Sequence, residues 1–345
     1  ARMRKENGHE APYNVKFWGI GNENWGCGGM MRPEYYADLY ARFAGYVKLT
    51  AGWENKMIAC GSHPGIPDWD RRFLEALEYS RHLVDYIALH NYSNHMCGVH
   101  STDFTEDQYR RLMVDCIQSL DDHIRRAIGV VQGFSTPHHR IGVILDEWGT
   151  WYTDAVVENG LYQQNSMQDA LFTATAFHTY HEHAEWLYMT NMAQTVNVLQ
   201  ALVLTKGDQL LTTPTYHVYE MYKPHRDGQY IDCRLGDTPA FAAPSGATRD
   251  AVSVTATTNE SGNTLFVSLV NMDPSTPVTL SATVAGAESW TIQSARRLDA
   301  GALQAHNTFE NPTTVAPEDL SVAGLSLEAF DLPARSVTTV MLKKA

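Results

Sequence analysis

The sequence is poor in cysteine, in charged residues and in long apolar runs. Its five cysteines are widely spaced and odd in number, without a CxxC pair, which argues against a disulfide framework and a zinc ribbon. No stretch approaches the roughly 18 consecutive apolar residues of a membrane span, and the first ten residues lack the apolar core of an export signal. A reducing compartment, the cytoplasm, is therefore the expected location.

Positive charge is also scarce. Lysine and arginine number 26 against 39 aspartates and glutamates, which gives a formal net charge of -13. A chain of this charge has no basic excess to neutralise phosphates, so neither nucleic acid nor an anionic membrane is an expected partner. A neutral or cationic ligand fits this composition better.

The chain is rich in apolar residues, at 44% of its 345 positions, so it can bury a sizeable core. Through the first two thirds, short β-rich apolar runs alternate with helical patterns, which is typical of βα units that build a parallel sheet. The runs are 15–23, 57–63, 84–92, 141–149 and 185–194. Each ends in polar or glycine residues, as strands do when their carboxyl ends open into a site.

Helices are predicted between these runs. Pro33 suits the first position of a helix over 33–48, and Ser166 with Asp169 resembles a capping box that opens another helix. Further helices are expected over 103–128 and near 214–223.

After about residue 227 the pattern changes to period-two strands separated by turn residues, which predicts an antiparallel sandwich. We therefore expect an α/β domain over residues 1–226 and a β-sandwich domain over 227–345.

Two glutamates are the strongest catalytic candidates. Glu23 and Glu147 each follow an apolar run directly, so each should stand at the carboxyl edge of a parallel strand, 124 residues apart in the chain. Opposed carboxylates suit the cleavage of a glycosidic bond, where one acid protonates the leaving oxygen and the other carboxylate attacks the anomeric carbon or directs water to it. Either glutamate alone could equally cap a helix or pair with arginine.

Aromatic side chains lie near the same strand ends. Trp25 follows the first glutamate, His90 and Tyr92 end the third run, and Trp151 follows the second glutamate. Sugar rings pack on such side chains while their hydroxyls bind polar groups. Each of these aromatics taken singly is more often a core residue.

Other motifs predict no cofactor and no metal. The glycine-rich segments 19–21 and 27–29 fit neither a dinucleotide nor a P-loop spacing. His178 and His181 share a helix face close to His183, but no third ligand is placed beside them, so we expect histidines that are solvated or lie at a helix end.

Four segments together resemble one enzyme family. WGIGNENWG, LHNY, LDEWGTWY and NMAQTVN are similar to motifs of the glycoside hydrolase family 51 α-L-arabinofuranosidases. The resemblance implies a (β/α)8 TIM barrel, of which this chain carries strands 4 to 8, followed by a C-terminal antiparallel β-sandwich. It implies Glu23 as general acid/base and Glu147 as nucleophile. It also implies that Asn22 binds the sugar 2-hydroxyl, that Tyr92 orients the nucleophile and that Gln194 contacts the furanose.

The resemblance also implies an activity and partners. It indicates a retaining exo-enzyme that removes terminal α-L-arabinofuranosyl residues from arabinan, arabinoxylan or their oligosaccharides, and a homo-oligomer, often a hexamer. Because a closed barrel needs eight strands and about 250 residues, we expect a second polypeptide to carry the first strands. The alternatives are an endo-β-glucanase or xylan-acting relative with the same glutamates, and a non-catalytic carbohydrate-binding fragment.

Overall fold

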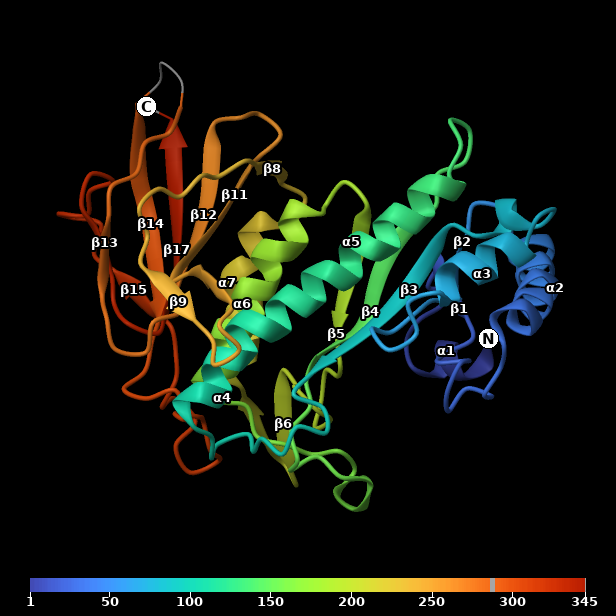
Figure 1. The fold of residues 1–345 in the computed structure, drawn as a ribbon, viewed down its shortest axis with the longest axis horizontal. Helices are drawn as coiled ribbons and strands as arrows, with labels where there is room; N and C mark the ends of the chain where they lie inside the picture. Colours follow the sequence, from blue (N-terminus) through green and yellow to red (C-terminus); the bar gives the residue numbers. More distant parts are fainter. Residues whose placement is uncertain (286–288, 345) are drawn as a thin grey trace. The chain divides into compact units, whose positions relative to one another are not determined.

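A computed structural model describes residues 1–285 and 289–344 (Figure 1). The helices and helical turns are α1 Arg2–Glu6, α2 Pro33–Ala51, α3 Trp69–Ala76, η1 Arg81–Leu83, α4 Glu106–Arg111, η2 Leu112–Cys116, α5 Ile117–Phe134, η3 Val157–Asn159, α6 Met167–Glu182, α7 Pro214–Tyr222 and η4 Lys223–His225. The strands are β1 Phe17–Ile20, β2 Lys56–Cys60, β3 Tyr86–Ser93, β4 Gly142–Thr150, β5 Leu187–Met192, β6 Val203–Lys206, β7 Gln209–Thr212, β8 Gln229–Ile231, β9 Ala240–Ala242, β10 Thr248–Asp250, β11 Val252–Thr258, β12 Thr264–Asn271, β13 Val278–Leu280, β14 Trp290–Leu298, β15 Glu318–Leu320, β16 Phe330–Leu332 and β17 Ser336–Lys344.

The five predicted β-rich runs form one sheet. Its strand order is β1-β2-β3-β4-β5, and β1 with β2 and β2 with β3 pair in parallel. Helices α2, α5 and α6 occupy the expected intervals, and the Asp169 side chain caps α6 by accepting the backbone N–H of Ser166 at 2.7 Å. The predicted α/β architecture of this part is confirmed, in an order that needs no crossing of connections.

The chain divides into two compact units. One contains residues 1–90 and 123–145, and the other contains 91–122 and 146–345. The division passes through β3 and β4, so each of these strands begins in the first unit and ends in the second. Glu23 follows β1 in the first unit, and Glu147 lies on the part of β4 that belongs to the second unit.

Antiparallel sheets follow the last helix of the α/β part. A six-stranded sheet has the order β15-β14-β17-β12-β11-β8, and β13 pairs with β16. The alternation of the sequence predicted β11, β12, β14 and β17 well, because each has seven residues or more. Strand β13 lies within the predicted run 277–284, but the other three-residue strands and the β6–β7 hairpin were not predicted, since so short a segment carries too little periodicity. Among the described residues, none of the helices has the length and apolar character needed to cross a membrane.

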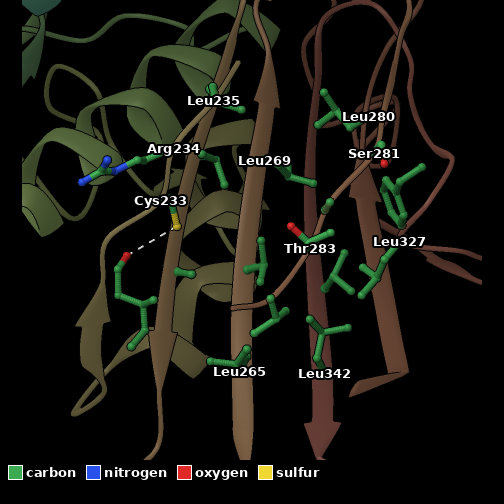
Figure 2. Close-up of a pocket in the computed structure, with 18 of the residues that line it drawn as sticks. Cys233, Arg234, Leu235, Leu265, Leu269, Leu280, Ser281, Thr283, Leu327 and Leu342 are labelled. Carbon is green, nitrogen blue, oxygen red and sulfur yellow. Dashed lines mark hydrogen bonds between the residues drawn. The ribbon is translucent and has the colours of Figure 1, made fainter. Parts of the chain in front are cut away.

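A cavity of about 930 Å³ lies in the antiparallel part (Figure 2). Strands β11, β12, β13 and β17 and the segment 231–239 line it, mostly with apolar side chains such as Leu265, Leu269 and Leu342. None of the side chains that the sequence marked as catalytic or sugar-binding lies among its lining residues. The candidate chemistry is therefore elsewhere.

Three histidines tie the α-helical layer to strand β11. The bonded pairs are His178 Nδ1 with Ser253 Oγ at 2.6 Å, His181 Nδ1 with Thr255 Oγ1 at 2.9 Å, and His225 Nδ1 with Thr257 Oγ1 at 2.9 Å. The expectation of solvated histidines is wrong for His178, which is 2% exposed. A strand distant in sequence covers this end of α6, and the local helical pattern contains no sign of that contact.

Burial in this network should make the protein sensitive to acid. Burial lowers the pKa of His225 to about 3 and of His181 to about 4. Unfolded histidine binds a proton near pH 6.5, so below that pH the unfolded state binds more protons than the folded state. The free energy of unfolding should therefore fall between about pH 6.5 and 4, by up to about 1.4 kcal/mol per pH unit for each such histidine.

The variant His225→Gln should be less stable at pH 7 but should lose stability less steeply on acidification. Urea denaturation at pH 7, 6 and 5 measures both effects. The exposed His138, changed to Gln, is the matched control and should keep the wild-type slope. An unchanged slope in His225→Gln would contradict the assignment.

Candidate active site

Glu23 lies in a tight loop that follows β1. Its backbone carbonyl accepts the N–H groups of Gly26 at 2.7 Å and Gly28 at 3.0 Å, and its φ is 42°, in the left-handed region. A Cβ atom on Gly28 would lie 1.8 Å from the carbonyl oxygen of Asn22. Only glycine fits at position 28, and this glycine allows the segment GNENWGCGG to fold back toward Glu23.

Both oxygens of the Glu23 carboxyl have a partner, one within this loop and one on β3. Oε1 lies 2.8 Å from Nδ1 of His90, and Oε2 accepts the thiol hydrogen of Cys27 at 3.1 Å. The Glu23 side chain is 22% exposed and that of His90 is 8% exposed. The carboxyl is thus fixed in direction while one part of it still meets solvent.

Trp25 and His63 lie beside this carboxyl. The indole N–H of Trp25 donates to the carbonyl of Gly61 at 2.9 Å, and its ring centroid is 4.3 Å from that of His63. Burial lowers the pKa of His63, while the charge of Glu23 opposes that change. His63 ends the second predicted run, so its place at a strand end was the signal that could have marked it as a site residue.

A buried serine, aspartate and histidine support this region without forming a nucleophilic triad. Ser62 Oγ donates to Asp70 at 2.7 Å and lies 3.2 Å from His123 Nε2. In a hydrolytic triad the histidine lies between the acid and the nucleophile, whereas here the serine lies between the other two. All three are at most 2% exposed, so we assign them to the support of the loop after β2.

Glu147 lies on β4, and Tyr92 of β3 binds it. The Tyr92 hydroxyl donates to Glu147 Oε2 at 2.8 Å. The ring of Trp151 packs edge-on against Tyr92, with ring centroids 5.2 Å apart. The ring of His95 stacks on Trp151, with centroids 4.2 Å apart. The sequence did not single out His95, which lies in a loop without a distinguishing motif.

The remaining sequence candidates are exposed. Gln194 follows β5 after a cis peptide bond, and its backbone N–H donates to the carbonyl of Val198 at 2.9 Å. Asn22 directly precedes Glu23 in the tight loop and is also exposed. Their roles toward a sugar stay predictions.

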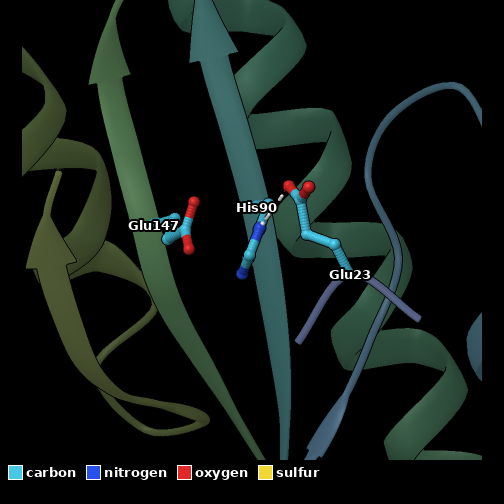
Figure 3. Close-up of side chains that lie close together, drawn as sticks. All are labelled: Glu23, His90 and Glu147. Atoms are coloured by element: carbon cyan, nitrogen blue, oxygen red, sulfur yellow. Dashed lines mark hydrogen bonds and ion pairs between the residues drawn. The ribbon is translucent and has the colours of Figure 1, made fainter. Parts of the chain in front are cut away.

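Strand β3 relates the two glutamates. His90 and Tyr92 are two residues apart on one strand, so they lie on the same face, about 6.6 Å apart along it. One binds Glu23 and the other binds Glu147. Figure 3 shows Glu23, His90 and Glu147, each of which offers a donor atom within 4.8 Å of the others.

These three side chains could bind a divalent ion. They could also carry out proton transfer and glycosyl transfer. Clusters of exposed acidic groups are common without any ion. In this cluster His90 Nδ1 is already bonded to Glu23 and one oxygen of Glu147 to Tyr92. We assign no metal to the site.

Two family profiles match the chain. Residues 1–111 match the profile described as "Alpha-L-arabinofuranosidase 1 domain", and residues 146–336 match "Alpha-L-arabinofuranosidase C-terminal domain". Glu23 lies in the first matched region and Glu147 in the second.

Individual relatives agree with these profiles. The chain is 32% identical over 99% of its length to the intracellular exo-α-L-arabinofuranosidase of Bacteroides ovatus, of which it covers 66%. It is 27% identical over 67% of its length to the intracellular exo-α-(1→5)-L-arabinofuranosidase 1 of Bacillus subtilis, of which it covers 49%. The chain thus spans about two thirds of the length of the first relative and about half of the length of the second.

A solved structure shares the fold. The GH51 arabinofuranosidase from Xanthomonas axonopodis pv. citri superposes with a TM-score of 0.84 at 32% identity, covering 99% of this chain and 69% of that one. The predicted fold class is confirmed: the parallel sheet is a half-barrel of the (β/α)8 type, followed by antiparallel sheets of a C-terminal sandwich.

The steric role of Gly28 gives a prediction. Gly28→Ala should displace the Glu23 loop and lower the free energy of unfolding by about 1–3 kcal/mol, because the added methyl group overlaps backbone that cannot rotate away. Urea denaturation measures this. Gly129→Ala is the matched control: it lies inside α5 with open space around it, so the same change should stabilise by about 0.5–1 kcal/mol. Equal stability of the two variants would refute the steric argument.

Proposed function

Because the chain belongs to glycoside hydrolase family 51, we propose that it carries the active-site glutamates of a retaining exo-α-L-arabinofuranosidase. The substrate is a terminal, non-reducing α-L-arabinofuranosyl residue of an arabinan, an arabinoxylan or an oligosaccharide derived from them. The reaction is a double displacement in which Glu23 is the general acid/base and Glu147 is the nucleophile. The names of the relatives from Bacteroides ovatus and Bacillus subtilis support both the sugar and the exo mode.

One observation carries the proposal: neighbouring same-face residues of β3 each bind one of the two glutamates. His90 binds Glu23 and Tyr92 binds Glu147, and these two residues share one face of β3. Retaining glycosidases need their two carboxyl groups about 5–5.5 Å apart, whereas inverting enzymes need room for a water between them. The resemblance of the motifs around Glu23 and Glu147 to family 51 supports the retaining class.

In the first step Glu23 gives its proton to the glycosidic oxygen while that oxygen leaves C1. A carboxylate oxygen of Glu147 forms the new bond to C1, with inversion. The Tyr92 hydroxyl donates to Oε2 of Glu147 and so orients the attacking carboxylate.

In the second step water attacks C1, its proton passes to the ionised Glu23, and the bond to Glu147 breaks with a second inversion. The anomeric configuration of the released arabinose is therefore retained. His90 Nδ1 stays bonded to Oε1 of the Glu23 carboxyl through both steps.

The other predicted residues complete a sugar site in this proposal. Trp25 and Trp151 offer ring faces beside the first and second glutamate, and each has its indole N–H bound to a backbone carbonyl, which fixes the ring. Asn22 binds the 2-hydroxyl, Gln194 contacts the furanose, and His90 adds a polar edge. These assignments follow the family resemblance of their motifs.

The organisation of the whole enzyme is also a proposal. We place the barrel portion at residues 1–226 and the sandwich at 227–345, in a cytoplasmic homo-oligomer, a hexamer by family resemblance. In the first unit, β1 ends the sheet and one face of α2 exposes Tyr35, Phe43, Tyr46 and Leu49. Such an apolar face beside an open strand edge supports a covering partner.

A substrate panel tests the activity. The protein should hydrolyse 4-nitrophenyl α-L-arabinofuranoside and release single arabinose units from debranched arabinan, with little action on the β-xyloside or β-glucoside. NMR of the first product should show the α-anomer. Activity confined to a long β-glucan or xylan would favour the endo-acting rival, and activity on none of them would favour a carbohydrate-binding fragment.

Azide distinguishes the two glutamates. Glu147→Ala should lose nearly all activity, and added azide should restore turnover with the β-azide as product, because azide enters the space of the nucleophile. Glu23→Ala should lower kcat/KM by about 10²–10⁴-fold on natural sugars but much less on dinitrophenyl substrates. With azide it should yield the α-azide, formed from the covalent intermediate. The same azide anomer from both variants would contradict the assigned roles.

A further inference from the structure

The thiol of Cys27 contacts the group proposed as acid/base. Cys27 follows Glu23 by four residues in the glycine-bounded loop, and its Sγ lies 3.1 Å from Oε2 of Glu23. The loop closes through the two backbone bonds to the Glu23 carbonyl, and Gly28 next to Cys27 has no room for a side chain. The thiol is therefore placed by the backbone of the loop and not by its own rotamer alone.

The contact completes the environment of the carboxyl. His90 lies at Oε1 and Cys27 lies at Oε2. The charge of Glu23 raises the pKa of His63 against the effect of burial, and Glu147 of β4 is the other carboxyl of the cluster. Hydrogen bonds donated to a carboxylate favour its ionised form. An S–H group is a weak donor compared with a hydroxyl. A thiol at this position therefore favours ionisation of Glu23 less than a serine would and more than an alanine would.

We propose that Cys27 is a positioning residue for the general acid/base, and that its thiol sets the pH range in which Glu23 can donate a proton. This inference rests on the proposed function, which requires the same carboxyl to be protonated in the first step and ionised in the second. A weak donor suits both demands because it orients the carboxyl and favours the ionised form less than a hydroxyl would.

The pH dependence of kcat/KM tests the proposal. The alkaline limb reports the loss of the acid's proton in the free enzyme. In Cys27→Ala its midpoint should move up by about half a pH unit, and in Cys27→Ser it should move down. Cys233→Ala, which removes a thiol in the sandwich, should leave the midpoint unchanged. Shifts of both Cys27 variants in the same direction, or no shift in either, would overturn the proposal.

A second measurement does not depend on activity. The rate at which iodoacetamide alkylates Cys27, followed by peptide mass spectrometry against pH, reports the ionisation of its thiol. A carboxylate at 3.1 Å opposes that ionisation, so the midpoint should fall in Glu23→Gln, while the exposed Cys97 in the same samples should keep its own midpoint. An unchanged Cys27 midpoint would show that the contact is absent.

The two measurements separate the possible failures. If the wild-type protein releases no arabinose but the alkylation midpoint shifts, the proposed function fails and the contact stands. If the protein is an arabinofuranosidase and Cys27 fails both measurements, only the positioning role is lost.

Discussion

The alternation of side chains along β3 is the constraint on which the candidate site depends. His90 and Tyr92 share one face of this strand because the period of a strand is two residues, and each is bonded to a different glutamate. A shift of one residue would turn both side chains to the opposite face and release both carboxyls. The register of a single buried strand therefore controls both proposed catalytic groups together.

The loop after β1 adds the second constraint. Glu23 has a positive φ, which a non-glycine residue adopts only at a cost of roughly 1–3 kcal/mol. The two hydrogen bonds to its carbonyl and the close packing at Gly28 oppose relaxation of that backbone. The carboxyl is thus presented by a strained, short segment, with His90 and Cys27 bonded to its two oxygens. Such preorganisation lowers the cost of aligning the acid with a leaving oxygen.

Buried polar groups serve a different purpose away from the glutamates. His178 and His225 each have both ring nitrogens bonded to hydroxyl groups, so these two side chains join helix α6 and turn η4 to the antiparallel sheet with their own polar atoms paired. The same low-polarity surroundings that strengthen these bonds disfavour the protonated histidine. Stability and acid sensitivity therefore have one physical origin in this part of the chain.

The sequence by itself determined the five parallel strands, their helices, the long antiparallel strands and the two glutamates at strand ends. It could do so because strand burial, helix caps and strand-end polar residues are local patterns. The family resemblance also implied the support of Tyr92 for Glu147. Only the tertiary structure revealed the bonds of His90 and Cys27 to Glu23 and the burial of His178. Most of these contacts join residues from different elements, and Cys27 reaches Glu23 only because the loop reverses. Which partners meet depends on the register of the sheet and on the path of each loop, and no local pattern encodes either.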